Sequence, residues 1–332
     1  MKRGSELIWL TEKDVESLLT MKEVLEVIER AFYLHGRGLV EMPPKSYLDF
    51  DPFDGDLRVM PAYMKGSKRA AGVKIVNSCA DNPAKGLPMV SGIMVYTDPE
   101  TGLPLGLFAA GFLTAIRTGA GGGVAAKFLS RPDSEVVGLI GCGHQAKTQA
   151  EALSLLFSIK EFKVWGKTRQ ESAAFCKKFK GLLRARLTPC AGVKEACEAD
   201  IVVTTTPVRT PLVKASWIRP GTHINAIGAD APGKQELDMK ILSKARIIVD
   251  DRHQSAHGGE INRAVSMGEF DPEMIVAEIG EVVAGKVDGR LRRSDITLFD
   301  STGLALQDVA VSQLLYEKAI HLKKGQVLKI NG

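Results

Sequence analysis

A glycine-containing loop near the middle of the chain restricts the fold more than any other feature. Gly141, Gly143 and Ala146 form the pattern G-x-G-x-x-A, with an apolar run at 136–140 before it and a helical pattern at 144–157 after it. The first glycine permits a tight turn, the second lets the backbone approach a pyrophosphate, and the small third residue lets the helix lie close to a sheet. The helix N-terminus then offers free N–H groups to the anion. The loop predicts dinucleotide binding, and a purely structural turn is the alternative.

Predicted strands and helices alternate regularly after residue 131. The strands are expected at 136–140, 162–165, 201–205, 223–227, 246–249 and 296–299, and the helices at 144–157 and 169–182. Such an alternation is typical of a parallel sheet with helices on both faces. We therefore predict an α/β protein with a Rossmann-type, doubly wound parallel sheet.

The first third of the chain has a different pattern. Residues 12–37 carry apolar residues at helical spacing, and Thr11 followed by Asp14 is typical of a helix start. Strand-like runs separated by turn signals follow at 57–60, 71–77 and 92–97. We expect an α+β arrangement with a mostly antiparallel sheet. A glycine-rich helix at 114–130 is expected to pack closely on a neighbour, and a helical tail at 305–320 to return to this first part.

The composition excludes several classes of protein. Hydrophobic residues make up 45% and charged residues 25%, as in soluble globular proteins, and the net charge of +5 is spread evenly, so nucleic acid is a weak candidate as partner. No apolar run approaches the ~20 residues that span a bilayer, and the N-terminus lacks the apolar stretch of a signal peptide. The five cysteines form no CxxC pair, which predicts reduced thiols in the cytoplasm. His253 and His257 alone do not complete a metal site, so no metal is expected.

The end of the second predicted strand bears on the choice of dinucleotide. NAD-binding units usually place an acid there, on the ribose hydroxyls. This chain has Gly166 at that point, followed by Lys167, Thr168 and Arg169. Two cations and a hydroxyl would hold a 2′-phosphate that a carboxylate would repel. The pattern favours NADP(H) or dual use, unless these cations are only solvated residues at a helix start.

Four charged residues stand in apolar surroundings or near a strand end. Arg58 and Lys74 interrupt apolar strand-like runs, Arg117 precedes small residues, and Asp230 follows the carboxyl end of a predicted parallel strand. Ligands bind at that end of open α/β sheets. Each residue alone could be a surface charge or a turn residue. Together, a guanidinium for a carboxylate, an ionisable amine and a carboxylate are what redox chemistry at the α-carbon of an amino acid requires.

Nine segments resemble the ornithine cyclodeaminase/mu-crystallin family and cover nearly the whole chain. They are MPPK (42–45), DLRVMPAY (56–63), GVKIVNS (72–78), KGLP (85–88), AIRTGAGGG (115–123), GCGHQA (141–146), HINAIGAD (223–230), PGKQELD (232–238) and FDSTGLALQD (299–308). PGKQELD, HGGEIN (257–262) and DSTGLALQDVAV are most similar to the archaeal-type alanine dehydrogenase branch of that family.

The resemblance implies a homodimer with two domains in each chain. Residues 121–304 would form the dinucleotide-binding domain, and 1–120 with 305–332 the substrate-binding and dimerisation domain. Lys74 and Asp230 would be catalytic, and Arg58 and Lys74 would bind the substrate, with Arg58 holding its carboxylate. The expected cofactor-binding residues are Arg117 near the phosphates, Gly141, Gly143, His144 and Gln145 over the pyrophosphate, Gly166, Lys167, Thr168 and Arg169 at the ribose, Ser301 and Thr302 beside the nicotinamide, and Thr205, Gly228, Ala229 and Asp230. The sequence departs from NAD-using members at Gly166–Thr168, where NADPH-binding, mu-crystallin-like members are more similar.

The predicted activity is the reversible, NAD(P)-dependent oxidative deamination of L-alanine to pyruvate and ammonia. The partners would then be an amino acid or 2-oxo acid and ammonia. Three alternatives remain open: conversion of L-ornithine to L-proline and ammonia by an ornithine cyclodeaminase, reduction of a cyclic imino acid or ketimine, and a non-catalytic NADP(H)-binding role like that of crystallins. The conjunction of Arg58, Lys74 and Asp230 argues against the last, because a carrier has no need of an acid/base pair.

Overall fold

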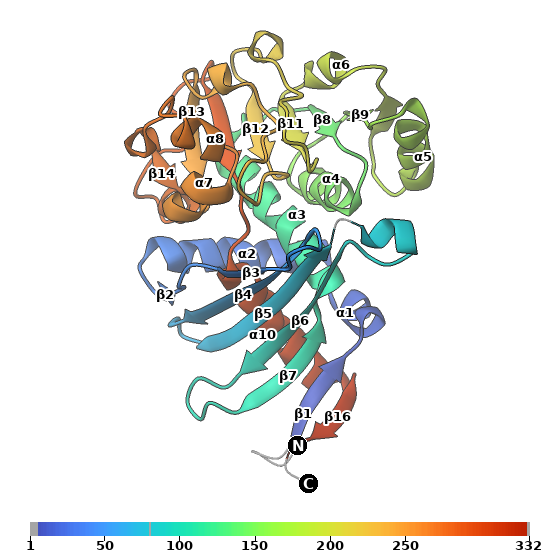
Figure 1. Ribbon diagram of the computed structural model, residues 1–332, viewed down its shortest axis with the longest axis vertical. Coiled ribbons are helices and arrows are strands. Elements are labelled where there is room, and N and C mark those ends of the chain that lie inside the picture. Colours follow the sequence, from blue (N-terminus) through green and yellow to red (C-terminus); the bar gives the residue numbers. More distant parts are fainter. Residues whose placement is uncertain (1–5, 80, 331–332) are drawn as a thin grey trace. The chain divides into compact units, whose positions relative to one another are not determined.

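Two eight-stranded sheets organise the computed structural model, which describes residues 6–79 and 81–330 (Figure 1). Each sheet belongs to one of two compact units. Unit 1 contains the chain up to Arg117 and again from Leu304 onward, and unit 2 contains Thr118–Gly303. The first unit is therefore built from two separate stretches of sequence.

The sheet of unit 2 is parallel throughout, in the order β10-β9-β8-β11-β12-β15-β13-β14. This confirms the predicted Rossmann-type, doubly wound sheet. The chain enters at β8 and reverses the direction of strand order between β8 and β11, which is the switch point where such sheets bind ligands. The strands are β8 (Val136–Ile140), β9 (Glu161–Trp165), β10 (Arg186–Pro189), β11 (Ile201–Thr204), β12 (His223–Ala226), β13 (Ala245–Val249), β14 (Ala277–Glu278) and β15 (Ile296–Asp300).

Helices cover both faces of this sheet because the central strands are apolar on both sides. In β11, Ile201 and Val203 belong to a core with α4 and α5, while Val202 belongs to a second core on the opposite face. The helices of unit 2 are α4 (His144–Leu156), α5 (Arg169–Phe179), α6 (Val193–Cys197), α7 (Arg252–Gly258), α8 (Asn262–Ser266) and α9 (Ile279–Val283), with short 3₁₀ turns η2 (Ala215–Trp217), η3 (Met239–Ile241) and η4 (Pro272–Met274).

Helix α3 (Ala110–Leu129) starts four residues before the predicted 114 and runs from unit 1 into unit 2. Its glycines serve close packing, as the sequence predicts. A Cβ atom on Gly122 would lie 2.1 Å from Oε1 of Gln149 in α4, a distance that no side chain tolerates. The Gln149 amide instead donates to the carbonyl of Thr118 at 3.0 Å, which ties the two helices together.

The sheet of unit 1 has the order β16-β1-β7-β6-β5-β4-β2, with β3 also paired to β4. Its neighbours are antiparallel except for β1 and β7, so the expected mostly antiparallel sheet is confirmed. The elements are β1 (Glu6–Leu10), β2 (Val40–Glu41), β3 (Ser46–Asp49), β4 (Gly55–Met64), β5 (Ala70–Cys79), η1 (Asn82–Lys85), β6 (Val90–Thr97), β7 (Pro104–Ala109), α10 (Ala305–Leu322) and β16 (Gln326–Lys329). Helix α10 packs against β4–β7 (Figure 1).

The prediction of one helical segment at 12–37 is wrong, because two helices occupy it. Helix α1 (Glu12–Leu18) ends where Leu19 takes an extended conformation, and α2 (Met21–Gly36) begins after Thr20. The Thr20 hydroxyl accepts from the Glu23 N–H at 3.4 Å, and the Thr20 N–H donates to the Glu23 carboxylate at 3.3 Å. This reciprocal capping box starts a new helix although the apolar spacing continues through the break.

Candidate active site

A buried lysine is the chemically distinctive residue of unit 1. Lys74 lies on β5 opposite Met60 of β4 and Met94 of β6, so its side chain points to the buried face of the sheet. It is 1% exposed. Its Nζ lies 2.8 Å from Oδ2 of Asp308 on α10, and it donates to the Thr114 hydroxyl at 3.4 Å. An ammonium in such a place requires a charged partner, and Asp308 supplies it.

Asp308 joins the lysine to a second cation. Its Oδ1 accepts from Nε of Arg117 at 3.0 Å, and Nη1 of Arg117 donates to Oε1 of Gln307 at 2.9 Å. Both Asp308 and Arg117 are buried. The sequence analysis did not single out Asp308, although an aspartate within the apolar helical run ALQDVAV was a usable signal. The expected role of Arg117 toward cofactor phosphates stays a prediction.

The surroundings of Lys74 lower the pKa of its ammonium group. Burial, and then the positive charge of Arg117, lower the pKa of Lys74 to about 7, while Asp308 acts in the opposite direction. An amine with a pKa near the working pH exchanges protons readily in both directions. The set of two cations and one carboxylate also favours an anionic ligand.

Arg58 lies on β4 two residues before Met60, so it projects from the same face of the sheet as Lys74. Its guanidinium donates to both carboxylate oxygens of Asp56, from Nε at 2.8 Å and from Nη2 at 2.9 Å. The Tyr47 ring lies 5.5 Å from its Cζ atom. These contacts fix the orientation of the guanidinium, whose edge formed by Nε and Nη2 is taken by Asp56.

The glycine loop of unit 2 follows β8 at the switch point of the sheet. Gly141 has φ +120°, and a Cβ atom there would lie 2.4 Å from the Thr205 hydroxyl. Gly143 is the N-cap of α4, and a Cβ atom on it would meet no atom of residues 6–79 or 81–330 within 4 Å, its chain neighbours and the backbone of its own helix aside. The fully buried Ala146 lets α4 pack on the sheet. The space in front of the α4 N-terminus is therefore open to a phosphate group, and His144 opens the helix beside it.

The other predicted cofactor residues of unit 2 follow the carboxyl ends of adjacent strands. Gly166, Lys167 and Thr168 come after β9, Thr205 after β11, Gly228, Ala229 and Asp230 after β12, and Ser301 and Thr302 after β15, while Gln145 and Arg169 lie in the first turns of α4 and α5. The structure thus brings these residues to one edge of the sheet. Asp230 forms an ion pair with Lys234 at 2.5 Å. It belongs to unit 2 while Lys74 belongs to unit 1, so their approach in catalysis stays a prediction.

Glu236, a buried carboxylate that the sequence did not point to, binds the backbone of two loops at this edge of the sheet. Glu236 accepts from the backbone N–H of Gly228 at 2.9 Å and of Thr206 at 2.6 Å. The backbone N–H of Glu236 in turn donates to the carboxylate of Glu260 at 3.0 Å. Burial raises the pKa of Glu236, and burial with the Glu236 charge raises the pKa of Glu260 well above its ordinary value. The loop that carries Asp230 is therefore fixed at Gly228.

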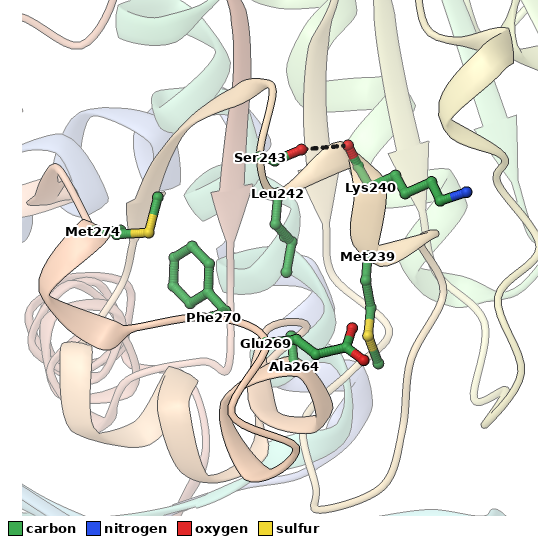
Figure 2. A pocket seen from close by; sticks show the side chains of 8 residues that line it. All are labelled: Met239, Lys240, Leu242, Ser243, Ala264, Glu269, Phe270 and Met274. Carbon is green, nitrogen blue, oxygen red and sulfur yellow. Dashed lines mark hydrogen bonds between the residues drawn. The ribbon is translucent and has the colours of Figure 1, made fainter.

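A cavity of about 160 Å³ lies elsewhere in unit 2, beside η3 and α8 (Figure 2). Apolar side chains such as Met239, Leu242 and Phe270 form much of its wall, and none of the predicted site residues lines it. Within residues 6–79 and 81–330, no group of three or more His, Cys, Asp or Glu residues is arranged to hold a metal ion. No helix in that part of the chain is long and apolar enough to cross a membrane.

These features define a two-unit α/β protein with a Rossmann-type nucleotide-binding fold. The model of the ornithine cyclodeaminase/mu-crystallin family matches residues 6–323, and the chain belongs to that family. It is 50% identical over 327 residues to an alanine dehydrogenase of Archaeoglobus fulgidus, covering 98% of each chain.

Solved structures agree with this assignment. An archaeal alanine dehydrogenase dimer with bound NAD has a TM-score of 0.94 and 49% identity, and the match covers 98% of this chain and 100% of that one. The Δ1-pyrroline-2-carboxylate reductase of Thermococcus litoralis, in complex with NADH and L-proline, has a TM-score of 0.93 and 36% identity over 96% of this chain and 99% of that one. Both of these relatives bind NAD or NADH.

Proposed function

We propose that this protein catalyses the reversible, NAD(P)-dependent oxidative deamination of L-alanine to pyruvate and ammonia. The observation that carries the proposal is the buried Lys74, paired with Asp308 at 2.8 Å and shifted to a pKa of about 7. A pKa near neutrality suits a lysine that transfers protons. The 50% identity to an alanine dehydrogenase supports alanine as the substrate.

In this mechanism the residues of the chain hold the substrate and move protons. Arg58 binds the substrate carboxylate through its guanidinium group, whose orientation Asp56 fixes. The bound nicotinamide supplies the hydride acceptor, and holding the α-carbon against it accounts for much of the rate. Asp230 takes a proton from the amine or from the water that attacks the resulting imine. As the carbonyl forms, neutral Lys74 accepts the proton of the hydroxyl group that the water has added, and Asp230 returns its proton to the departing ammonia.

The glycine loop fits a dinucleotide, since the position over Gly143 is open and the N-terminus of α4 faces it. Lys167, Thr168 and Arg169 would hold a 2′-phosphate at the adenosine end, so we propose that NADP(H) is accepted and favoured over NAD(H). The relatives with bound NAD or NADH support the use of this class of cofactor.

A homodimer in the cytoplasm completes the proposal. The archaeal relative of 49% identity is a dimer. Five cysteines are free, and Cys176, Cys190 and Cys197 are buried, as expected for a protein kept in a reducing compartment.

Reduction of a cyclic imino acid is the second candidate. Its support is the similarity to the pyrroline-carboxylate reductase of Thermococcus litoralis, at 36% identity over almost the whole chain. The same carboxylate-binding and proton-transferring residues would serve, because both reactions pass hydride between the nicotinamide and the α-carbon of an amino acid.

A substrate screen at 340 nm tests the proposal. We expect absorbance to rise with L-alanine and NAD⁺ or NADP⁺, and Lys74→Ala to lower kcat by about 10³-fold. The exposed Lys68, paired with Glu317, provides the control, and Lys68→Ala should keep full activity. Faster turnover of Δ1-pyrroline-2-carboxylate than of pyruvate with ammonia, or ammonia release from L-ornithine without net absorbance change, would replace alanine as the substrate. Normal turnover in Lys74→Ala would refute the mechanism.

A further inference from the structure

The acidic residue that usually binds the adenosine ribose is replaced by a glycine after β9. In dinucleotide-binding folds this acid ends the second strand and accepts from the ribose hydroxyls. Gly166 occupies the position here, and a Cβ atom on it would lie 2.7 Å from the Sγ atom of Cys142 in the glycine loop. Any side chain at 166 would push against the loop that holds the pyrophosphate. The missing acid is therefore a consequence of packing, and does not by itself identify the cofactor.

A carboxylate reaches the same place from the next helix. The Oε2 atom of Glu171 lies 3.2 Å from where a Cβ atom of residue 166 would be, close to the space into which an acid at 166 would extend. The N-cap fixes the backbone of Glu171, because its N–H donates to the Thr168 hydroxyl at 3.2 Å. A negative side chain is also favoured in the first turn of a helix. Burial and, next, the Glu171 charge raise the pKa of Cys142 to about 11, in agreement with a carboxylate that faces the loop.

Two cations near Glu171 in the sequence have the opposite effect on the binding of a 2′-phosphate. Lys167 and Arg169 flank the Thr168 cap, and both are exposed. A 2′-phosphate would be attracted by these cations and repelled by Glu171, whereas a 2′-hydroxyl would find an acceptor in Glu171. The preference for NADP(H) expected from residues 166–169 is therefore weakened by the negative charge of Glu171.

We propose that Glu171 limits the preference for NADP(H), by accepting from the adenosine ribose hydroxyls of NAD(H) and opposing the 2′-phosphate of NADP(H). The protein then uses both cofactors, with Glu171 and the pair Lys167 and Arg169 as the opposing determinants. This inference rests on the dinucleotide site of the proposed function.

Direct binding measurements test the inference without turnover. The dissociation constants of NADH and NADPH are measured by nucleotide fluorescence for the wild type and for Glu171→Gln. We expect the ratio Kd(NADH)/Kd(NADPH) to rise by about 10-fold or more in the variant, the size of one charged hydrogen bond. Lys167→Ala should shift the ratio in the opposite direction. Glu269→Gln, an exposed glutamate beside the cavity of Figure 2, is the matched control and should leave the ratio unchanged.

The outcomes separate this inference from the proposed function. If Glu171→Gln still binds NADH or NADPH and its Kd(NADH)/Kd(NADPH) ratio equals that of the wild type, the role of Glu171 is overturned and the proposed function is not. A wild type that binds neither nucleotide overturns both the proposed function and the inference. Because Glu171 is exposed, the variant is expected to keep the thermal midpoint of the wild type, so that a changed ratio reports on the site and not on unfolding.

Discussion

At the scale of single residues, the proposed chemistry depends on the contacts among three buried charged side chains. Lys74 and Arg117 both contact Asp308, and with one carboxylate for two cations the lysine gives up its proton most easily. The neutral amine is the form that accepts a proton. Because the pKa of Lys74 is about 7, we expect kcat/KM for L-alanine to rise with pH through about 7 and then level off.

Asp308→Asn separates the effect of the ion pair from that of burial. Removal of the anion that favours the charged amine should move this rise in kcat/KM to lower pH, because burial and the positive charges of Arg117 and Lys45 all lower the pKa of Lys74. The substitution also leaves the buried Arg117 without its counter-charge, so the free energy of unfolding should fall by about 3–5 kcal/mol. The measurements are the pH profile and a urea titration. An unchanged position of the acidic limb would show that another group governs the pH dependence.

At the scale of elements, the turn between β8 and α4 contains two glycines with different expected roles, since the fold requires Gly141 and cofactor binding is expected to require Gly143. At Gly141, φ is +120° and a Cβ atom would lie 2.4 Å from the Thr205 hydroxyl, so Gly141→Ala should cost about 1–3 kcal/mol of folding stability. Gly143 has room for a methyl group and an ordinary φ of −86°. Gly143→Ala should therefore change stability by less than about 0.5 kcal/mol and yet raise Kd for NADH by ~10-fold, because the methyl group takes the space of the pyrophosphate.

Thermal unfolding and nucleotide fluorescence, applied to both alanine variants, check this difference. Each variant serves as the control for the other, since both add one methyl group to the same loop. A Gly143→Ala protein that binds NADH like the wild type would place the pyrophosphate elsewhere.

The same scale shows how far the sequence specifies the structure. The predicted strands of unit 2 end within one residue of the observed ones, because central strands buried on both faces are continuous apolar runs. The edge strand β10 and the two-residue β14 lack such runs and were not predicted. Helix α5 ends at Phe179 and not at 182, since Gly181 has φ +83°. The capping box at Thr20 was readable in the sequence but was outweighed by apolar spacing.

For the candidate site, the sequence predicts some residues but not their distant partners. Lys74 was detectable because a charge interrupts an apolar strand, and the alternation of side chains then places it on the face of Arg58. Its partner Asp308 is 234 residues away, and the helix that carries it packs on the sheet through long-range contacts that no local pattern specifies. Glu171 was overlooked for a related reason, since its relevance depends on the space beside Gly166, which only packing reveals.

At the scale of the whole molecule, the sheet of unit 1 has one face that α10 covers and one that stays apolar but incompletely buried. Met60, Lys74 and Met94 point to α10 from three adjacent strands. The residues between them in sequence, such as Ile75 and Ile93, pair across the opposite face, and Ile93 is 37% exposed. A contiguous apolar face of this kind is typical of an interface with another chain.

We therefore expect this face to form the proposed homodimer. Light scattering coupled to size exclusion should give twice the 35.9 kDa of one chain for the wild type. Ile93→Glu should give the monomer mass, because each of two facing copies would then bury an unpaired carboxylate in the interface. Leu155→Glu, on the exposed side of α4 in unit 2, adds the same charge at a similarly exposed leucine and should leave the dimer intact. A dimer that survives Ile93→Glu and dissociates with Leu155→Glu would move the interface from the sheet of unit 1 to unit 2.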